Sequence, residues 1–192
     1  MNAAERALAE TRAWLERVVI GLNLCPFAKA PWIKGQVRIV ACASDDPRAV
    51  LDMLCAEMRL LSAAPETEVE TTLLVHPNAL RDFDDFNDFL DAAEAALAEL
   101  QLEGVLQIAS FHPEYRFDGT GPDDLGNATN RSPHPTLHLL REAGVARAVE
   151  AFPEAEAIFE ANIAQLDALG ADGWAALQAQ CRSDADGAQS KS

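Results

Sequence analysis

The sequence has no long apolar run, and this absence argues against a membrane-spanning helix. Such a helix needs about 20 consecutive apolar residues, and no apolar stretch in this chain of 192 residues approaches that length. Residues 1–18 carry acids and arginines at helical spacing, without the basic segment and apolar stretch of a signal peptide. We therefore expect a cytoplasmic protein with no membrane partner.

Basic surface is also scarce. The chain has 15 lysines and arginines against 31 aspartates and glutamates, and its formal charge is −16. This charge repels polyanions, and the sequence shows none of the basic stripes that nucleic-acid-binding proteins carry. We expect no nucleic-acid partner.

Cysteine is sparse and scattered. Cys25, Cys42, Cys55 and Cys181 form no CxxC pair, which argues against a zinc knuckle or a disulfide framework and fits a reducing cytosol. Cys25 follows the end of a predicted helix, where the helix dipole opposes a thiolate, so a buried structural cysteine is favoured over a nucleophile. Nucleotide and flavin motifs such as GxGxxG and the P-loop are missing too.

What is present is a regular alternation of helical and strand patterns. The spacing of apolar residues predicts helices over about 3–22, from Pro47 onward, over 80–102, over 135–150, over 153–169 and around Trp174. Strands are predicted over 36–43, 71–75 and 105–111. With 49% apolar and 24% charged residues, we expect one globular domain over residues 1–181 and a disordered tail over 182–192.

This order predicts the α/β class. Helical crossovers between successive strands favour parallel neighbours joined right-handedly. We expect a small, mainly parallel sheet of three or slightly more strands packed by helices. A ferredoxin-like α+β sandwich with an antiparallel strand is the alternative.

Two histidines follow predicted strands, each before a proline. His76 and His112 would emerge at the carboxyl edge of a parallel sheet, where α/β proteins place ligands. A loop over residues 112–132, long for a compact domain, starts there, and it opens with Glu114, Tyr115 and Arg116. The simpler interpretation is that each His-Pro pair ends its strand, with the imidazole bonded to backbone.

Polar chemistry concentrates in NRSPHPTLHLLRE, residues 130–142. A helix beginning near Ser132 or His134 would offer free N–H groups to an anion, and Asn130 and Arg131 would add donors. These residues therefore predict a cradle for a small anionic molecule. The alternative is a capping turn in which Asn130 and Ser132 bond the backbone and Arg131 pairs with an aspartate.

The same predicted helix raises the question of a metal. His134, His138 and Glu142 stand four residues apart, and a divalent ion held by His112, His138 and Glu142 is one hypothesis, with Glu114 as another third ligand. No HExxH motif is present, and this helix face partly points into apolar packing. A histidine satisfied by a Glu or Arg neighbour is the alternative.

Three segments resemble a family. TRAWLERVVIGLNLCPFA, LQIASFHPEYRF and NATNRSPHPTLHLLREAGVARAV are similar to motifs of an uncharacterised bacterial domain-of-unknown-function family. The resemblance covers nearly the whole chain except its last dozen residues and implies no substrate, cofactor or catalytic residue. In that family the position of His134 is often aromatic, which favours His112, Arg131 and His138 as site residues.

The leading functional hypothesis is a small enzyme of the hydrolase or lyase type. His112 and His138 would exchange protons, oriented by Tyr115 or Glu114, because imidazole titrates near neutral pH. An anionic substrate would be held by Asn130, Arg131 and Ser132, with His76 and Arg116 as further binding residues. The alternatives are a non-catalytic ligand-binding or regulatory module at the same pocket and an acidic protein-interaction domain.

Overall fold

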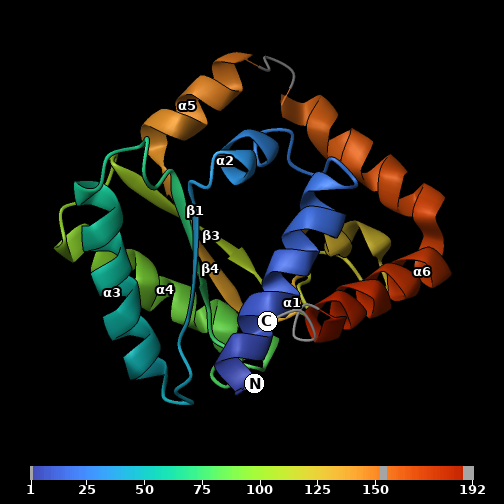
Figure 1. Ribbon diagram of the computed structural model, residues 1–192, viewed down its shortest axis with the longest axis horizontal. Helices are drawn as coiled ribbons and strands as arrows, with labels where there is room; N and C mark the ends of the chain where they lie inside the picture. Colours follow the sequence, from blue (N-terminus) through green and yellow to red (C-terminus); the bar gives the residue numbers. More distant parts are fainter. Residues whose placement is uncertain (1, 152–154, 188–192) are drawn as a thin grey trace.

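The protein is built on one four-stranded sheet. The computed structural model describes residues 2–151 and 155–187 (Figure 1). Its strands are β1 (Val37–Ala41), β2 (Thr71–Val75), β3 (Leu106–Phe111) and β4 (Thr136–Arg141). The α/β class expected from the sequence is confirmed, with helices on both faces of the sheet.

The strands are arranged in the order β1-β2-β4-β3. β1 and β2 are parallel, whereas β4 pairs antiparallel with both β2 and β3. Three strands therefore run in one direction, and β4, which runs in the other, lies between two of them. All five residues of β2 are buried, so this strand forms the centre of the domain.

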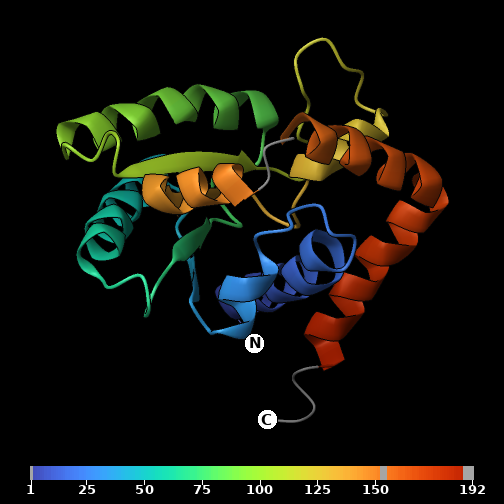
Figure 2. The same cartoon turned by 90° about the horizontal axis from the view of Figure 1, so that it is seen from above.

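Helices cover both faces of the sheet, as the view in Figure 2 also shows. In Figure 1, α3 (Pro47–Ala63) and α4 (Phe83–Glu99) lie to the left of the strands, and α1 (Ala3–Trp14) and α6 (Ala155–Gly187) lie to the right. Leu54, Met58 and Phe86 pack with Leu137 and Leu139 on the first face. The second face packs against α1, and α6 covers the outer side of α1.

Short-range signals fix where these helices begin. Asn2 and Glu5 form a reciprocal capping box at α1, with both bonds at 2.9 Å. Asp46 caps α3 ahead of Pro47, and Asp82 accepts two backbone N–H bonds at the start of α4. None of the helices in the described part of the chain has both the length and the apolar character of a membrane span.

A π-helical segment continues α1. It is η1 (Leu15–Ile20), and single π-helical turns are rare and often accompany functional sites. At Gly21, where η1 ends, a Cβ atom would stand 2.2 Å from the Arg17 carbonyl oxygen. Only glycine fits there without a backbone shift. Asn23 then turns the chain with a positive φ of 55° toward α2 (Lys29–Ile33).

The helix expected over 135–150 is wrong in its first half. Residues 136–141 form β4, and only the second half is helical, as α5 (Glu142–Ala151). Leucine and arginine favour a helix locally, but tertiary context overrides propensity. Here β2 and β3 both need a hydrogen-bonding partner, and β4 supplies it.

The C-terminal region follows the expected helices and differs in its tail. α6 consists of two helical segments that meet at Gly170, whose backbone is not helical (φ 69°, ψ 172°), in agreement with the two helices predicted over 153–169 and around Trp174. Residues 182–187 are helical rather than a disordered tail. Cys181 and Ala185 are buried in this last part of α6, and their packing stabilises the helix beyond residue 181. Pro153 and residues 188–192 lie outside the described residues.

Candidate functional site

The polar residues 130–132 bond to the protein's own backbone. Asn130 Nδ2 donates to Ser110 O at 3.2 Å, and Ser132 Oγ donates to His134 O at 2.6 Å. The Arg131 guanidinium donates to the carbonyls of Tyr115 (3.3 Å) and Pro122 (2.6 Å). The helix N-terminus expected beside them does not exist, because β4 follows. Arg131 therefore holds the long loop in place.

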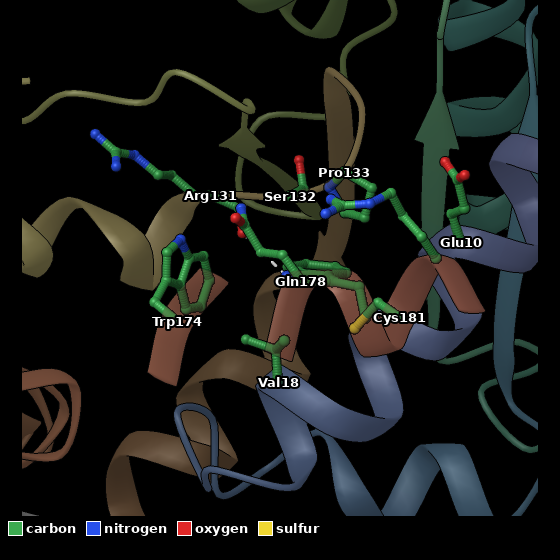
Figure 3. Close-up of a pocket in the computed structure, with 10 residues that line it drawn as sticks. Glu10, Val18, Arg131, Ser132, Pro133, Trp174, Gln178 and Cys181 are labelled. Carbon is green, nitrogen blue, oxygen red and sulfur yellow. Dashed lines mark hydrogen bonds between the residues drawn. The ribbon is translucent and has the colours of Figure 1, made fainter. Parts of the chain in front are cut away.

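A hollow of about 40 Å³ lies beside these residues. In Figure 3 the Arg131 side chain extends away from Glu10, which lies at the other side of the hollow. Glu10 Oε2 is 2.7 Å from His134 Nε2 and Oε1 is 2.9 Å from Arg6 Nε. The hydrogen bond to His134 leads the causes that lower the Glu10 pKa. A carboxylate here disfavours an anionic ligand, and the hollow has room for little more than water.

His76 and His112 do lie together at one edge of the sheet, but both rings are fully buried. Each is 0% exposed, and their ring centroids lie 5.7 and 5.1 Å from that of Phe86 on α4. His112 Nδ1 accepts from the Glu114 N–H, and Nε2 lies 3.3 Å from Leu80 O. Desolvation lowers the pKa of both rings, that of His76 to about 4. The strand-ending interpretation fits these contacts.

Residues 114–116 follow His112 onto the surface beside α4. Arg116 pairs with Asp84 at 2.9 Å and lies over the Phe83 ring, and Tyr115 packs edge-on against Phe83. Glu114 is exposed. These side chains do not converge with the His138 ring.

His138 lies on the opposite face of the sheet from His112. Its ring is 6.0 Å from that of Phe111, while His112 faces α4. The predicted site, in which His112 and His138 both exchange protons with one bound substrate, is therefore wrong, because the sheet separates the two rings. The hypothetical metal site formed by His112, His138 and Glu142 is wrong for the same reason. The described residues contain no group of three or more side chains that could hold a metal ion.

A much larger hollow, a cleft of about 370 Å³, lies on the His138 face of the sheet. Its floor is formed by β2, β3 and β4, and its walls by η1, α2 and α5. Figure 1 shows α2 and α5 at the same end of the molecule. The apolar lining residues are Trp14, Leu15, Val19, Phe27, Ala28, Pro31, Val37, Leu73, Ala109, Phe111, Leu140, Gly144, Val145, Ala148 and Val149. Its volume lies within the range of small-molecule sites.

One polar pair lies on the cleft floor. Thr71 Oγ1 is 2.6 Å from Leu139 O and 2.6 Å from His138 Nε2. A hydroxyl has a single proton, and a carbonyl oxygen can only accept a hydrogen bond. The Thr71 proton therefore goes to Leu139 O, and Nε2 of His138 donates to Thr71 Oγ1. Burial lowers the pKa of His138 to about 4, so the ring is neutral at pH 7.

The two charged groups of the described lining, Glu70 and Arg141, are already engaged. The Arg141 guanidinium donates to Ala64 O at 2.7 Å and twice to Val69 O, at 2.9 and 3.3 Å. Glu70 lies 3.5 Å from Arg147. Its carboxylate also approaches Gly144 so closely that a Cβ there would stand 2.6 Å away. The two contacts of Glu70 hold α5 at the mouth of the cleft.

Cys25 also lines the cleft, and its sulfur is a thiol. Burial raises its pKa, although backbone N–H groups oppose the shift. This agrees with the sequence expectation that Cys25 is not an activated nucleophile. All four cysteines are free.

Sequence reasoning found His138 but missed its surroundings. Thr71 and Gln107 stand in predicted strands, where no sequence motif marks them as site residues. The alternation of Thr136, His138 and Leu140 on one side with Leu137 and Leu139 on the other is a period of two, typical of a strand. That period would have placed His138 on a sheet face.

The comparisons with known proteins agree with the resemblance noted in the sequence. No match was found among curated proteins or among solved structures. Residues 6–176 match the family described as "Protein of unknown function (DUF1415)". Because this match spans most of the chain, the protein belongs to that family.

Proposed function

We propose that this protein binds a small, largely apolar molecule in the cleft between the sheet and α5. The observation that carries the proposal is the cleft of about 370 Å³, lined mainly by apolar side chains, with the Thr71–His138 pair on its floor. A large apolar pocket with few polar groups and a perturbed pKa is typical of a ligand site.

Binding without turnover fits these groups better than the hydrolase- or lyase-type reaction expected from the sequence. A general base works best when its pKa lies near the working pH, and the pKa of His138 is about 4. The Cys25 thiol is not activated. The free cysteines support the cytoplasmic setting that the sequence predicts.

A matched pair of α5 variants tests the proposal. Ala148 lines the cleft, whereas Ala146, two residues away, is exposed and does not line it. Nile red, an uncharged apolar dye, should bind the wild type with a rise in fluorescence. Ala148→Phe should weaken that binding at least about tenfold by filling the cleft, and Ala146→Phe should leave it unchanged.

Two outcomes would contradict the proposal. Either the wild type shows no saturable Nile red binding, or both variants bind like the wild type while remaining folded by circular dichroism. Mass spectrometry of bound molecules before and after incubation then separates binding from turnover, because a ligand that is only bound keeps its mass.

A further inference from the structure

We infer that the ligand of this cleft is an uncharged amphiphile, an apolar body carrying a hydroxyl or N–H group that donates to Nδ1 of His138. The inference rests on the proposed function and specifies the chemical class of its ligand. It replaces the small anionic molecule expected from the sequence, and three features of the cleft lead to it.

The first feature is the free acceptor on His138. When Thr71 donates to Leu139 O, Nε2 carries the ring proton and Nδ1 keeps its lone pair. No described residue hydrogen-bonds Nδ1, and this atom is not completely buried. The ring lines the cleft. A neutral imidazole with an open Nδ1 accepts a hydrogen bond from a ligand.

The second feature is that the cation of the described lining, Arg141, is held by bonds to the protein backbone. Its Nε and Nη2 atoms donate to the carbonyls of Ala64 and Val69. Glu70, which also lines the cleft, repels a carboxylate or phosphate. An anion would lose its hydration beside Glu70, and Arg141 could turn toward it only by giving up bonds to the carbonyls of Ala64 and Val69. Burying a charge without a close partner is costly. An uncharged head group avoids that cost.

The third feature is the second neutral polar group, Gln107. It lies on β3 with its side chain on the same face as Ala109, the register partner of His138. Diagonal neighbours of this kind lie about 7–8 Å apart. The amide can donate or accept, so it suits a ligand with a hydroxyl or carbonyl group rather than one with a charge.

Three ligands of equal chain length test the inference. They are 1-octanol, which has an O–H donor, octyl methyl ether, which has none, and octanoate, which is anionic. Their affinities are measured at pH 7.5 by displacement of Nile red, for the wild type and for His138→Phe. Phenylalanine keeps the packing against Phe111 and removes the acceptor. The difference between the proteins cancels the unequal affinities of these ligands for water.

We expect octanol to gain about three- to tenfold over the ether in the wild type relative to His138→Phe, which is one hydrogen bond. Octanoate should bind more weakly than octanol. If His138→Phe does not fold, Thr71→Val is measured instead, and it should reduce the same preference by releasing Nε2.

The outcomes separate the two claims. Displacement of Nile red by octanoate as tightly as by octanol, or an octanol preference that survives His138→Phe, overturns the ligand class and leaves the cleft as a binding site. A wild type that binds neither Nile red nor any of the three ligands overturns the proposed function itself.

Discussion

Acidification from pH 7.5 to 5.0 should destabilise this protein through its buried histidines. The pKa of both His76 and His138 falls from 6.5 to about 4, in each case chiefly through desolvation. Between these pH values the unfolded chain takes up protons that the folded protein excludes. Stability is therefore fully present above pH 6.5 and falls as the pH drops toward 4.

The magnitude follows from the two pKa values. At pH 5.0 an imidazole that shifts from 6.5 to about 4 lowers the free energy of unfolding by about 2 kcal/mol relative to pH 7.5. His76 is 0% exposed, so this figure applies to it directly. For His138, whose ring borders the cleft, water reduces the effect, and we expect about 1–2 kcal/mol.

Urea unfolding of the wild type and of His138→Phe at both pH values measures the effect. The variant should lose about 1–2 kcal/mol less than the wild type between pH 7.5 and 5.0, while Ala146→Phe should lose as much as the wild type. At pH 5.0 Glu10 contributes little, because its pKa is lowered in the folded protein and its ordinary value of 4.5 also lies below this pH. Equal losses in wild type and His138→Phe would mean that His138 is protonated in the folded protein, and our account of the cleft floor would be wrong.

Two further predictions concern groups around the cleft and the loop. Because burial raises its pKa, Cys25 should react with iodoacetamide at pH 8 at least about tenfold more slowly than free cysteine, and 1-octanol should slow the reaction further. Mass spectrometry of the modified peptide gives both rates. A Cys25 rate equal to that of free cysteine would refute its burial. Arg131→Met removes the bonds to the carbonyls of Tyr115 and Pro122, so stability should fall by about 1–3 kcal/mol and trypsin should cut after Arg116 faster. The affinity for Nile red should stay the same. A loss of Nile red binding would show that Arg131 contributes to the binding site.

Most elements of the fold were predictable because their signals are local. The strand over 71–75 and the helix that opens at Asp46-Pro47 occur where the sequence predicts them. A continuous apolar run marks a buried strand, and a cap followed by proline marks a helix start. Such signals depend only on neighbouring residues.

The strand over 136–141 was not predicted because its cause is not local. Its residues TLHLLR include good helix formers, and a helix does follow at Glu142. What decides the outcome is the position between β2 and β3, two strands that come from distant parts of the chain. Pairing on both sides satisfies the backbone of β4, which outweighs a propensity difference of less than about 1 kcal/mol per residue.

The error at 136–141 moved the predicted site to the wrong place. On a helix, His138 would stand near Arg131 and His112. On a strand, its side chain alternates to the face that packs against α1, and Phe111 and Thr71 become its neighbours. The polar stretch 130–132 attracted attention for its chemistry, yet that chemistry serves backbone carbonyls of the long loop and of neighbouring strands.

The size of the cleft is itself an argument for an occupant. In buried apolar cavities, unfilled space costs about 24 cal/mol per Å³, so a closed void of about 370 Å³ would cost about 9 kcal/mol. This is an upper limit, because the cleft opens to water, but it is comparable with the whole stability of a typical domain, about 5–15 kcal/mol. The ion pairs of Arg147 with Glu66 and Glu70, and the close approach of Glu70 to Gly144, nevertheless hold α5 at the mouth of the cleft. A molecule that fills this space restores the lost packing, so its binding should raise the melting temperature in proportion to the apolar surface it covers.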